Sequence, residues 1–434
     1  MSDISKKIRA LAAECEAGLQ VKFAEFDEVS RHNTEKTLEA FRALQLGERH
    51  FFPTSGYGYN DDGRELCDAA FARVFGCERG FARHSIVSGT HALGIGLFGL
   101  LRPGDTLLSI TGKPYDTLEG IIGIRSQESG DGRRKTRDME TRGRETGTGD
   151  GSLADFGVNY RQIELKDGKS VDTEAVMTAL AADKSVKVVY AQRSRGYLDR
   201  PSLSAAALTE LYHKVKSVSG AYFVADNCYG EFCETEEPKA DLLIGSLIKN
   251  PGGGIAESGA YITGTEKAVE LAAGRLTVPG IGLECGASLG QTKNMLKGLF
   301  LAPHTVAQAL KTAAFASALF STLGYKVSPL PLEKRYDIIQ TVSLGAPKPL
   351  EAFCKGLQSG SPVDSYAAPE AWDMPGYADR VIMAAGAFTQ GSSLELSADG
   401  PLKAPYTVFL QGGLTYESGR YGIMRAAEEL RVES

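Results

Sequence analysis

The sequence of 434 residues lacks the features that mark several classes of protein. Its longest apolar run, residues 92–101, is interrupted by glycines and falls well short of the ~18 apolar residues that suggest a membrane-spanning helix. The N-terminal stretch MSDISKKIRALAAECEAGLQ alternates charged and small apolar residues and has no apolar core typical of a signal peptide. We therefore expect a soluble, cytoplasmic protein without a membrane partner.

An excess of basic residues is also missing. The formal net charge is -6, so no global basic field holds a polyanion, and we expect no nucleic-acid partner. The cysteines number seven and show no CxxC spacing, which argues against a disulfide framework and against a structural metal site. No GxxxxGK[ST] phosphate loop is present, which disfavours a nucleotide-binding protein. A small-molecule partner is the remaining expectation.

What is present is a regular alternation of strand-like and helical stretches. The β-branched and apolar runs are IVSG at 86, TLLSI at 106, VKVVYAQ at 186, AYFVADN at 221 and DLLIGSL at 241. This order predicts an α/β fold with a mostly parallel sheet sandwiched by helices. Ligands of such sheets bind at the carboxyl ends of the strands, so functional residues are sought just after each strand.

The length predicts more than one domain, because a single hydrophobic core rarely serves a chain of this size. We predict an N-terminal helical arm over residues 1–54, a large ligand-binding domain over 55–300 and a smaller C-terminal α+β domain over 301–434. The last begins with the helical pattern TVAQALKTAAFASALFSTLG and includes the strand-like runs DIIQTVSL at 337, VIMAAG at 381, SLELSA at 393 and YTVFLQGG at 406. Residues 125–151 are almost devoid of apolar residues and predict a mobile surface insertion.

Three candidate functional features follow expected strands. Ser88-Gly89-Thr90 opens a helix, where free amides bind anions, although serine at this position is also an ordinary N-cap. Asp226 ends AYFVAD, where a buried carboxylate needs a cation or several donors; a metal ligand or a helix cap would look the same. Lys249 stands between GSLI and NPGGG, where a solvated surface cation is the simpler interpretation.

Together these features match what pyridoxal 5′-phosphate requires. This cofactor needs a cradle for its phosphate, a carboxylate partner for its pyridinium nitrogen and an amine with which to form a Schiff base. The order of the three features along the chain supports this hypothesis, and burial at an apolar strand end is expected to favour the neutral form of the Lys249 amine.

The sequence resembles the fold-type I pyridoxal-phosphate enzymes, and within them the aluminium-resistance, or methionine gamma-lyase-related, family of carbon-sulfur lyases. The stretches that carry the resemblance are GYGYNDDGR (56–64), SIVSGTHAL (85–93), YAQRSRGYLDRPSL (190–203), VADNCYGEF (224–232), GSLIKNPGGGIAESGAYITG (245–264), GLFLAPHTVAQAL (298–310) and SLELSADGP (393–401). The resemblance implies a lyase reaction on a sulfur-containing amino acid, of the cystathionine beta-lyase or methionine gamma-lyase type.

The resemblance also implies roles for individual residues. Lys249 would bind the cofactor covalently and then act on the α-proton of the substrate, while Asp226 would hold the pyridine nitrogen. The phosphate would lie against Ser88, Gly89, Thr90 and Ser246, with the ring of Tyr115 stacked on the cofactor; a tyrosine packed in a loop is the alternative. Tyr57 and Tyr59 resemble the tyrosine that related enzymes contribute to a neighbouring subunit, which implies a homodimer or homotetramer, although SGYGY also suits a simple turn.

An amino-acid substrate needs a cation for its carboxylate. Related lyases take it from a strand of the small domain, where this chain offers Lys403, whereas Arg193 and Arg195 follow a strand of the large domain. All three are candidates, with surface ion pairing as the alternative for the two arginines. Other functions also stay open, because fold does not determine reaction: an aminotransferase or a decarboxylase on the same scaffold, or a protein that binds the cofactor without turnover.

Overall fold

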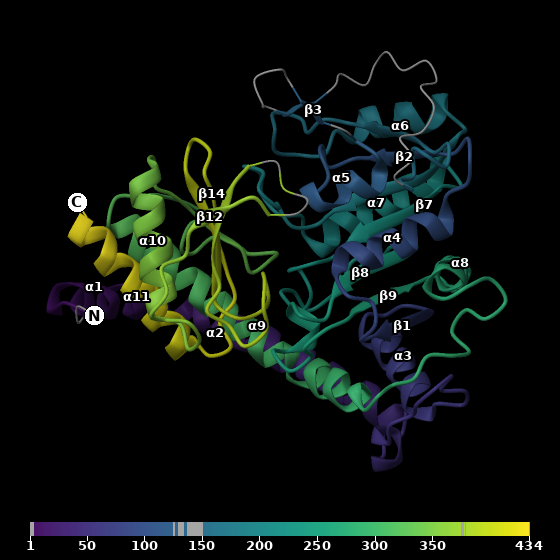
Figure 1. The fold of residues 1–434 in the computed structure, drawn as a ribbon, viewed down its shortest axis with the longest axis horizontal. Helices are drawn as coiled ribbons and strands as arrows, with labels where there is room; N and C mark the ends of the chain where they lie inside the picture. Colours follow the sequence, from purple (N-terminus) through teal and green to yellow (C-terminus); the bar gives the residue numbers. More distant parts are fainter. Residues whose placement is uncertain are drawn as a thin grey trace.

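The fold is built on two large sheets, each covered by helices, and a long helix that joins them, as a computed structural model shows (Figure 1). The structure describes residues 4–124, 126–128, 134–136, 151–374, 377 and 379–433. The α/β class and the mostly parallel large sheet predicted from the sequence are confirmed. The expected mobile insertion at 125–151 lies outside the described residues, except for Gly151 and the short strands β3 (Ser126–Glu128) and β4 (Arg134–Thr136).

The large domain contains most of the elements before residue 290. Its helices are α3 (Asp62–Val74), α4 (Gly89–Leu100), α5 (Asp116–Ile122), α6 (Thr173–Ala182), α7 (Ala205–Val218) and α8 (Glu266–Leu276). Its strands are β1 (Arg79–Arg83), β2 (Thr106–Ser109), β5 (Asn159–Gln162), β6 (Val186–Gln192), β7 (Tyr222–Asp226), β8 (Leu242–Ser246) and β9 (Ala260–Gly264).

The seven strands of this sheet have the order β1-β9-β8-β7-β6-β2-β5. Strands β5, β2, β6, β7 and β8 run parallel, while β9 runs antiparallel to β8 and to β1. Because helices cover both faces, the central strands are apolar on both sides, and every residue of β7 after Tyr222 and of β8 is buried. The register pairs Gln192 with Asp226 and Asp226 with Ile244, so the carboxyl ends of β6, β7 and β8 meet at one edge.

One predicted strand of the large domain is wrong. Residues 86–89 were expected to form a strand, but the strand here is the earlier β1, and the Ile86 amide donates to the Arg83 carbonyl in a turn. Ile86 is fully buried in the core cluster that includes α4 and the sheet. The apolar side chain of Ile86 therefore serves packing against α4, and Ile86 is not part of a strand of the large sheet.

The small domain is built on an antiparallel sheet. Its strands β10 (Lys326–Ser328), β11 (Gln340–Ser343), β12 (Ala371–Trp372), β13 (Val381–Ala384), β14 (Ser397–Pro401) and β15 (Thr407–Gln411) have the order β10-β11-β15-β14-β13-β12. Helices α10 (Pro347–Ser359) and α11 (Tyr416–Glu433) pack against each other beside it. The strand predicted from residue 393 begins only at Ser397, because the Leu394 amide donates to the carbonyl of Ile248 in the large domain.

Helix α9 (Gln291–Thr322) runs from the large domain into the small one, with α2 (Gln20–Ala43) packed along it (Figure 1). The expected domain boundary at residue 301 falls inside this helix. The first helix, α1 (Lys6–Gly18), packs on α9 and α11, and Ser5 donates to the Glu428 carboxylate through its hydroxyl (2.6 Å). The N-terminal arm therefore lies against the small domain and against the helix that joins the two domains.

Glycines allow close backbone contact at two places that position the site. In the 3-10 turn η3 (Asn250–Gly252), which follows Lys249, a Cβ on Gly252 would collide with the Leu247 carbonyl, and a Cβ on Gly298 of α9 would collide with Gly252. The glycine spacing of residues 94–99 matches GxGxxG but lies inside α4, where Gly99 packs on the backbone of α8. These glycines therefore serve helix and loop packing, and the spacing in α4 forms no nucleotide-binding turn.

Two further features concern the class of the protein. None of the helices in the described part of the chain combines the length and the apolar character needed to cross a bilayer. All seven cysteines are free thiols.

Candidate functional site

A cavity of about 150 Å³ lies at the carboxyl ends of β6, β7 and β8, beside the start of α4. Most of the residues predicted to bind a cofactor line it: Ser88, Gly89, Thr90, Tyr115, Asp226, Ser246 and Lys249. The structure therefore brings together three sequence features, of which Ser88-Gly89-Thr90 precedes Asp226 and Lys249 by more than a hundred residues. Further lining residues include Gln192, Tyr229, Tyr377 and Ser392.

Lys249 follows β8, and its side chain points across the ring of Tyr229, with Nζ 3.9 Å from the ring centroid. Burial acts to lower the pKa of this amine, but the acidic groups Cys228, Tyr229 and Asp226 outweigh burial and raise it. The expectation that burial at the strand end would favour a neutral amine is therefore wrong for this pocket. These three acidic groups therefore favour the protonated form of the Lys249 amine.

Asp226 ends β7 and is buried behind the cavity. Its carboxylate accepts hydrogen bonds from the Cys228 amide (3.1 Å) and from the Tyr190 hydroxyl (3.3 Å). Burial raises the pKa of Asp226, while the charge of Lys249 and these hydrogen bonds oppose the shift. A buried carboxylate with so few donors is suited to hold a further cation or N–H group.

The start of α4 forms an anion cradle. Ser88 is the N-cap and accepts a hydrogen bond from the His91 amide through Oγ (3.1 Å). The amides of Gly89 and Thr90 have no acceptor among the described residues, and both residues line the cavity. A Cβ on Gly89 would lie 3.1 Å from Cys228 Sγ, so a side chain here would crowd the cradle. These groups fit a phosphate, which accepts hydrogen bonds from free helix amides.

Sequence reasoning missed a group of aromatic and acidic residues that joins the two domains at this site. Tyr115 lines the cavity as expected, and its hydroxyl is hydrogen-bonded to that of Tyr377 in the small domain (2.8 Å). Tyr197 lies beside both rings and donates to the buried Asp399 of β14 (3.0 Å), which also accepts from Ser392. Burial raises the pKa of Asp399 to about 6. The run SLELSADGP already contained Asp399, but no local pattern showed that it faces the large domain.

The tyrosines expected to reach a neighbouring subunit lie away from the cavity of their own chain. Tyr57 and Tyr59 stack on each other, with ring centroids 5.5 Å apart, and are 74% and 59% exposed. The turn that carries them is held firmly, because Arg64 donates to the carbonyls of Gly58 (2.6 Å) and Gly286 (2.9 Å).

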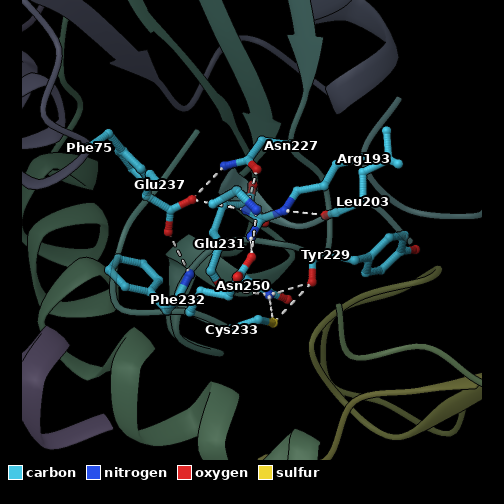
Figure 2. A network of polar contacts seen from close by, with 12 residues as sticks. Phe75, Arg193, Leu203, Asn227, Tyr229, Glu231, Phe232, Cys233, Glu237 and Asn250 are labelled. Atoms are coloured by element: carbon cyan, nitrogen blue, oxygen red, sulfur yellow. Dashed lines mark hydrogen bonds and ion pairs between the residues drawn. The ribbon is translucent and has the colours of Figure 1, made fainter. Parts of the chain in front are cut away.

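The three candidate cations for the substrate have different surroundings. Arg193 is fully buried in the polar network of Figure 2, where it pairs with Glu234 (2.8 Å) and Glu237 (3.1 Å) and donates to Asn227 (2.7 Å). It lines neither this cavity nor the one beside it, so the structure does not bring Arg193 to the other predicted site residues. Arg195 and Lys403 line a larger, adjacent cavity.

Comparison with known proteins identifies the family. The sequence profile of the family described as methionine gamma-lyase matches residues 8–140 and 139–431 of the chain. The chain belongs to the methionine gamma-lyase family. The Bacillus subtilis relative YnbB is 44% identical over 428 residues, which cover 98% of this chain and 96% of the relative. The resemblance inferred from the motifs is thus confirmed.

Solved structures of similar proteins have the same fold. A carbon-sulfur lyase involved in aluminium resistance from Clostridium novyi NT is 44% identical, with a TM-score of 0.89 over 99% of this chain and 96% of that chain. A candidate cystathionine beta-lyase involved in aluminium resistance from Clostridium acetobutylicum is 43% identical, with a TM-score of 0.90 over 98% and 96%. The pyridoxal-5′-phosphate-dependent protein YhfS of Escherichia coli, at 15% identity and a TM-score of 0.60 over 94% and 97%, shares the fold alone.

Proposed function

We propose that this member of the methionine gamma-lyase family is a pyridoxal-phosphate-dependent lyase that breaks a carbon-sulfur bond of an amino acid. The observation that carries the proposal is the convergence of Lys249, Asp226 and the free amides of α4 on one cavity. The name of the Clostridium novyi relative, a carbon-sulfur lyase, supports the type of bond.

The residues of the cavity divide into those that would hold the cofactor and those that would act on the substrate. Gly89, Thr90 and Ser246 would hold the phosphate, Asp226 the ring nitrogen and Lys249 the aldehyde carbon. When bound, pyridoxal phosphate supplies an aldehyde that condenses with amines and a protonated ring that accepts the electron pair of a carbanion. Asp226 favours that protonated ring, because a buried carboxylate is stabilised by a nearby N–H group.

Lys249 would have a second task toward the substrate. Its Nζ would accept the proton from the α-carbon of the substrate, since Lys249 lines the cavity beside Tyr229. Tyr115 covers the cavity, and burial holds its pKa well above the ordinary value. Its hydroxyl therefore stays protonated and can donate to the departing sulfur.

The substrate carboxylate needs a cation that is not already neutralised. Lys403 is exposed and pairs with Asp379 (3.2 Å), and Arg193 is held by two glutamates. Arg195 is buried in a cavity wall, and no carboxylate pairs with it in the described part of the chain. We assign Arg195 to a substrate carboxylate; Lys403 lines the same cavity as Arg195.

We also propose that the active unit is a homodimer or homotetramer. The exposed, stacked pair Tyr57 and Tyr59 does not serve the cavity of its own chain. Two large aromatic side chains on a turn held by Arg64 are typical of a surface that contacts another protein.

The test combines product analysis with a matched pair of lysine variants. The purified protein supplied with pyridoxal phosphate should release pyruvate or 2-oxobutyrate with ammonia from cystathionine or methionine. After borohydride reduction, mass spectrometry should find the cofactor on the peptide that contains Lys249. Lys249→Ala should lose both signals, whereas Lys214→Ala, which removes an exposed lysine on α7, should keep them.

Other results would overturn the proposal in distinct ways. Turnover that depends on a second keto acid would identify an aminotransferase. Cofactor bound at Lys249 but unaffected by any sulfur amino acid would identify a binding protein without turnover. Cofactor attached elsewhere, or absent from a folded and saturated preparation, would refute the assignment of the cavity.

A further inference from the structure

Asp399 is a buried carboxylate to which the proposed function assigns no task. It lies on β14, is 3% exposed and pairs in register with Met383 and Phe409 of the two neighbouring strands. Within the described residues its hydrogen-bond partners are two hydroxyls, those of Tyr197 (3.0 Å) and Ser392 (3.1 Å), and no cation pairs with it. A buried carboxylate without a cation is costly, and a neutral asparagine could accept the same hydrogen bonds. The charge of Asp399 therefore calls for a functional explanation.

The two partners of Asp399 belong to the walls of two cavities. Ser392 lines the cofactor cavity, and Tyr197 lines the larger cavity of about 370 Å³, whose walls come from both domains. Tyr197 follows β6 of the large domain, so its hydrogen bond to β14 crosses the domain interface. Asp399 itself lines neither cavity. It can therefore act on a ligand only through the groups that it holds.

Residues 193–203, here called the Tyr197 loop, are in direct contact with Tyr115. Gly196 has a φ of +57°, and a Cβ at this position would lie 3.1 Å from Cδ2 of the Tyr115 ring. The rings of Tyr197 and Tyr115 also meet edge to face, with centroids 5.7 Å apart. Tyr115 lines both cavities. A shift of the loop would therefore move the ring that covers the cofactor cavity.

Two carboxylates of the small domain hold this loop, at different places and in different fields. Asp337 accepts hydrogen bonds from Ser194 (2.6 Å) and Ser202 near the two ends of the loop. The charge of Asp337 also interacts with the buried guanidinium groups of Arg200 and Arg335. At the middle of the loop, Asp399 holds Tyr197 with hydroxyl donors alone. Asp399 is therefore the carboxylate whose charge is less well compensated.

The groups that face Asp399 make its charge sensitive to pH. Burial raises the pKa of Asp399 to about 6, while the two hydroxyls and the charge of Lys249 oppose the shift. Strands β13 and β15 beside it carry no titratable side chain, and burial and the charge of Asp399 raise the pKa of the Cys354 thiol on α10. Burial also raises the pKa of the tyrosines around it, which are Tyr115, Tyr197, Tyr229 and Tyr377. Proton uptake near pH 6 therefore falls on Asp399 and replaces a charged acceptor with a weaker neutral one.

From these contacts we infer that Asp399 is a positioning residue, whose carboxylate docks the Tyr197 loop onto the small domain and thereby holds Tyr115 over the cofactor cavity. This role in catalysis rests on the proposed lyase function and deepens it, because Tyr115 is the group assigned to the departing sulfur. The docking itself needs no turnover. It is strongest while Asp399 is ionised and weakens when the carboxylate takes up a proton.

Hydrogen–deuterium exchange with mass spectrometry tests the docking on the full chain supplied with pyridoxal phosphate. Peptides that contain Leu198 report on the loop, because the Leu198 amide donates to the Arg195 carbonyl (3.0 Å). Asp399→Asn keeps the shape of the side chain and removes its charge. At pH 8 the loop of this variant should exchange about threefold to tenfold faster than that of the wild type, as expected when a neutral acceptor replaces a charged one. At pH 5, where the wild-type carboxylate is protonated, the two rates should agree.

Two further variants and a control complete the experiment. Tyr197→Phe removes the donor and keeps the ring, so it should also accelerate exchange at pH 8, and it carries the test if Asp399→Asn does not fold. The double variant should exchange no faster than Tyr197→Phe alone, because both changes break one contact. Asp364→Asn is the matched control: this exposed aspartate of the small domain also accepts from a tyrosine hydroxyl, that of Tyr366 (3.1 Å). It should leave the loop unchanged.

Three outcomes would overturn the inference. Unchanged exchange in Asp399→Asn or Tyr197→Phe at pH 8 would show that the carboxylate does not dock the loop. Acceleration of Asp399→Asn by the same factor at pH 5 and pH 8 would show that its charge has no role beyond packing. Additive effects of the two substitutions would show that Asp399 does not act through Tyr197. A protein that shows the expected exchange pattern but cleaves no thioether would refute the lyase proposal and leave the docking role of Asp399 standing.

Discussion

The buried arginine network after β6 leads to a quantitative prediction about stability. Arg193 is fully buried, and Glu237, one of its two partners, has a side chain that is only 1% exposed. Arg193→Met keeps the length of the side chain but leaves Glu237 (Figure 2) without its cation, and Glu234 likewise. Removing one partner of a buried ion pair costs about 3–5 kcal/mol, because the remaining charge stays desolvated.

A surface arginine supplies a matched control. Arg31 on α2 also pairs with two glutamates, Glu28 and Glu35, but its side chain is 57% exposed. Arg31→Met should scarcely change the stability, since exposed ion pairs contribute little. Urea unfolding followed by circular dichroism compares the midpoints of the two variants, and urea carries no charge that would screen the ion pairs.

Two results are expected from this comparison. The midpoint of Arg193→Met should fall far below that of Arg31→Met, and adding Glu237→Gln to Arg193→Met should recover part of the loss by removing a stranded charge. Similar midpoints for the two arginine variants, or no recovery in the double variant, would refute the stabilising role of the network.

Three further predictions follow from described contacts. Gly298→Ala should destabilise the protein by about 1–3 kcal/mol, because the loop after Lys249 must move; Gly274→Ala, in helix α8 with open space around it, should be neutral or stabilising in the same unfolding assay. Burial raises the pKa of Glu231 to about 8, so the native state keeps a proton that the unfolded state loses near pH 4.3. From pH 5 to pH 8, the free energy of unfolding of the wild type should therefore fall relative to that of Glu231→Gln by roughly 1 kcal/mol per pH unit. Parallel pH profiles of the two proteins would contradict this prediction. Replacing Tyr57 and Tyr59 with serine should weaken cofactor affinity or dissociate the oligomer in analytical ultracentrifugation, and a variant unchanged in both would exclude the proposed contact with a neighbouring subunit.

The candidate site could largely be predicted from the sequence because its parts lie at the ends of regular elements. Asp226 ends β7, Lys249 comes shortly after β8 and Gly89 begins α4, and the parallel arrangement brings the ends of β7 and β8 to one edge of the sheet. The wrongly predicted strand at residues 86–89 did not affect this result. The amides of Gly89 and Thr90 are placed by the start of α4, whether a strand or a turn precedes it.

Contacts between the domains could not be predicted in the same way. Asp399 and Tyr377 reach the site from the small domain, and their partners Tyr197 and Tyr115 belong to distant segments. No periodic pattern in a sequence records which loops of two domains face each other. The same limit applies to charge: the pKa of Lys249 depends on Cys228, Tyr229 and Asp226 together, which only a three-dimensional arrangement reveals.

Neighbouring residues show how sharply this limit applies. Arg193 and Arg195 are two positions apart in QRSRGY and have the same side chain. One meets two glutamates, while the other meets a cavity and a serine. Their different roles arise from the course of the loop after β6, and sequence alone offered equal grounds for both.

The packing of α2 along α9 has a consequence for how the chain is made. Phe23 and Phe26 on α2 are buried, yet α9 begins only at Gln291. During synthesis on the ribosome, the first helices emerge long before the surface that covers them exists. The apolar faces of these helices must remain exposed, or be shielded by a chaperone, until the final third of the polypeptide has been translated. The arm and the small domain can therefore fold against each other only near the end of synthesis.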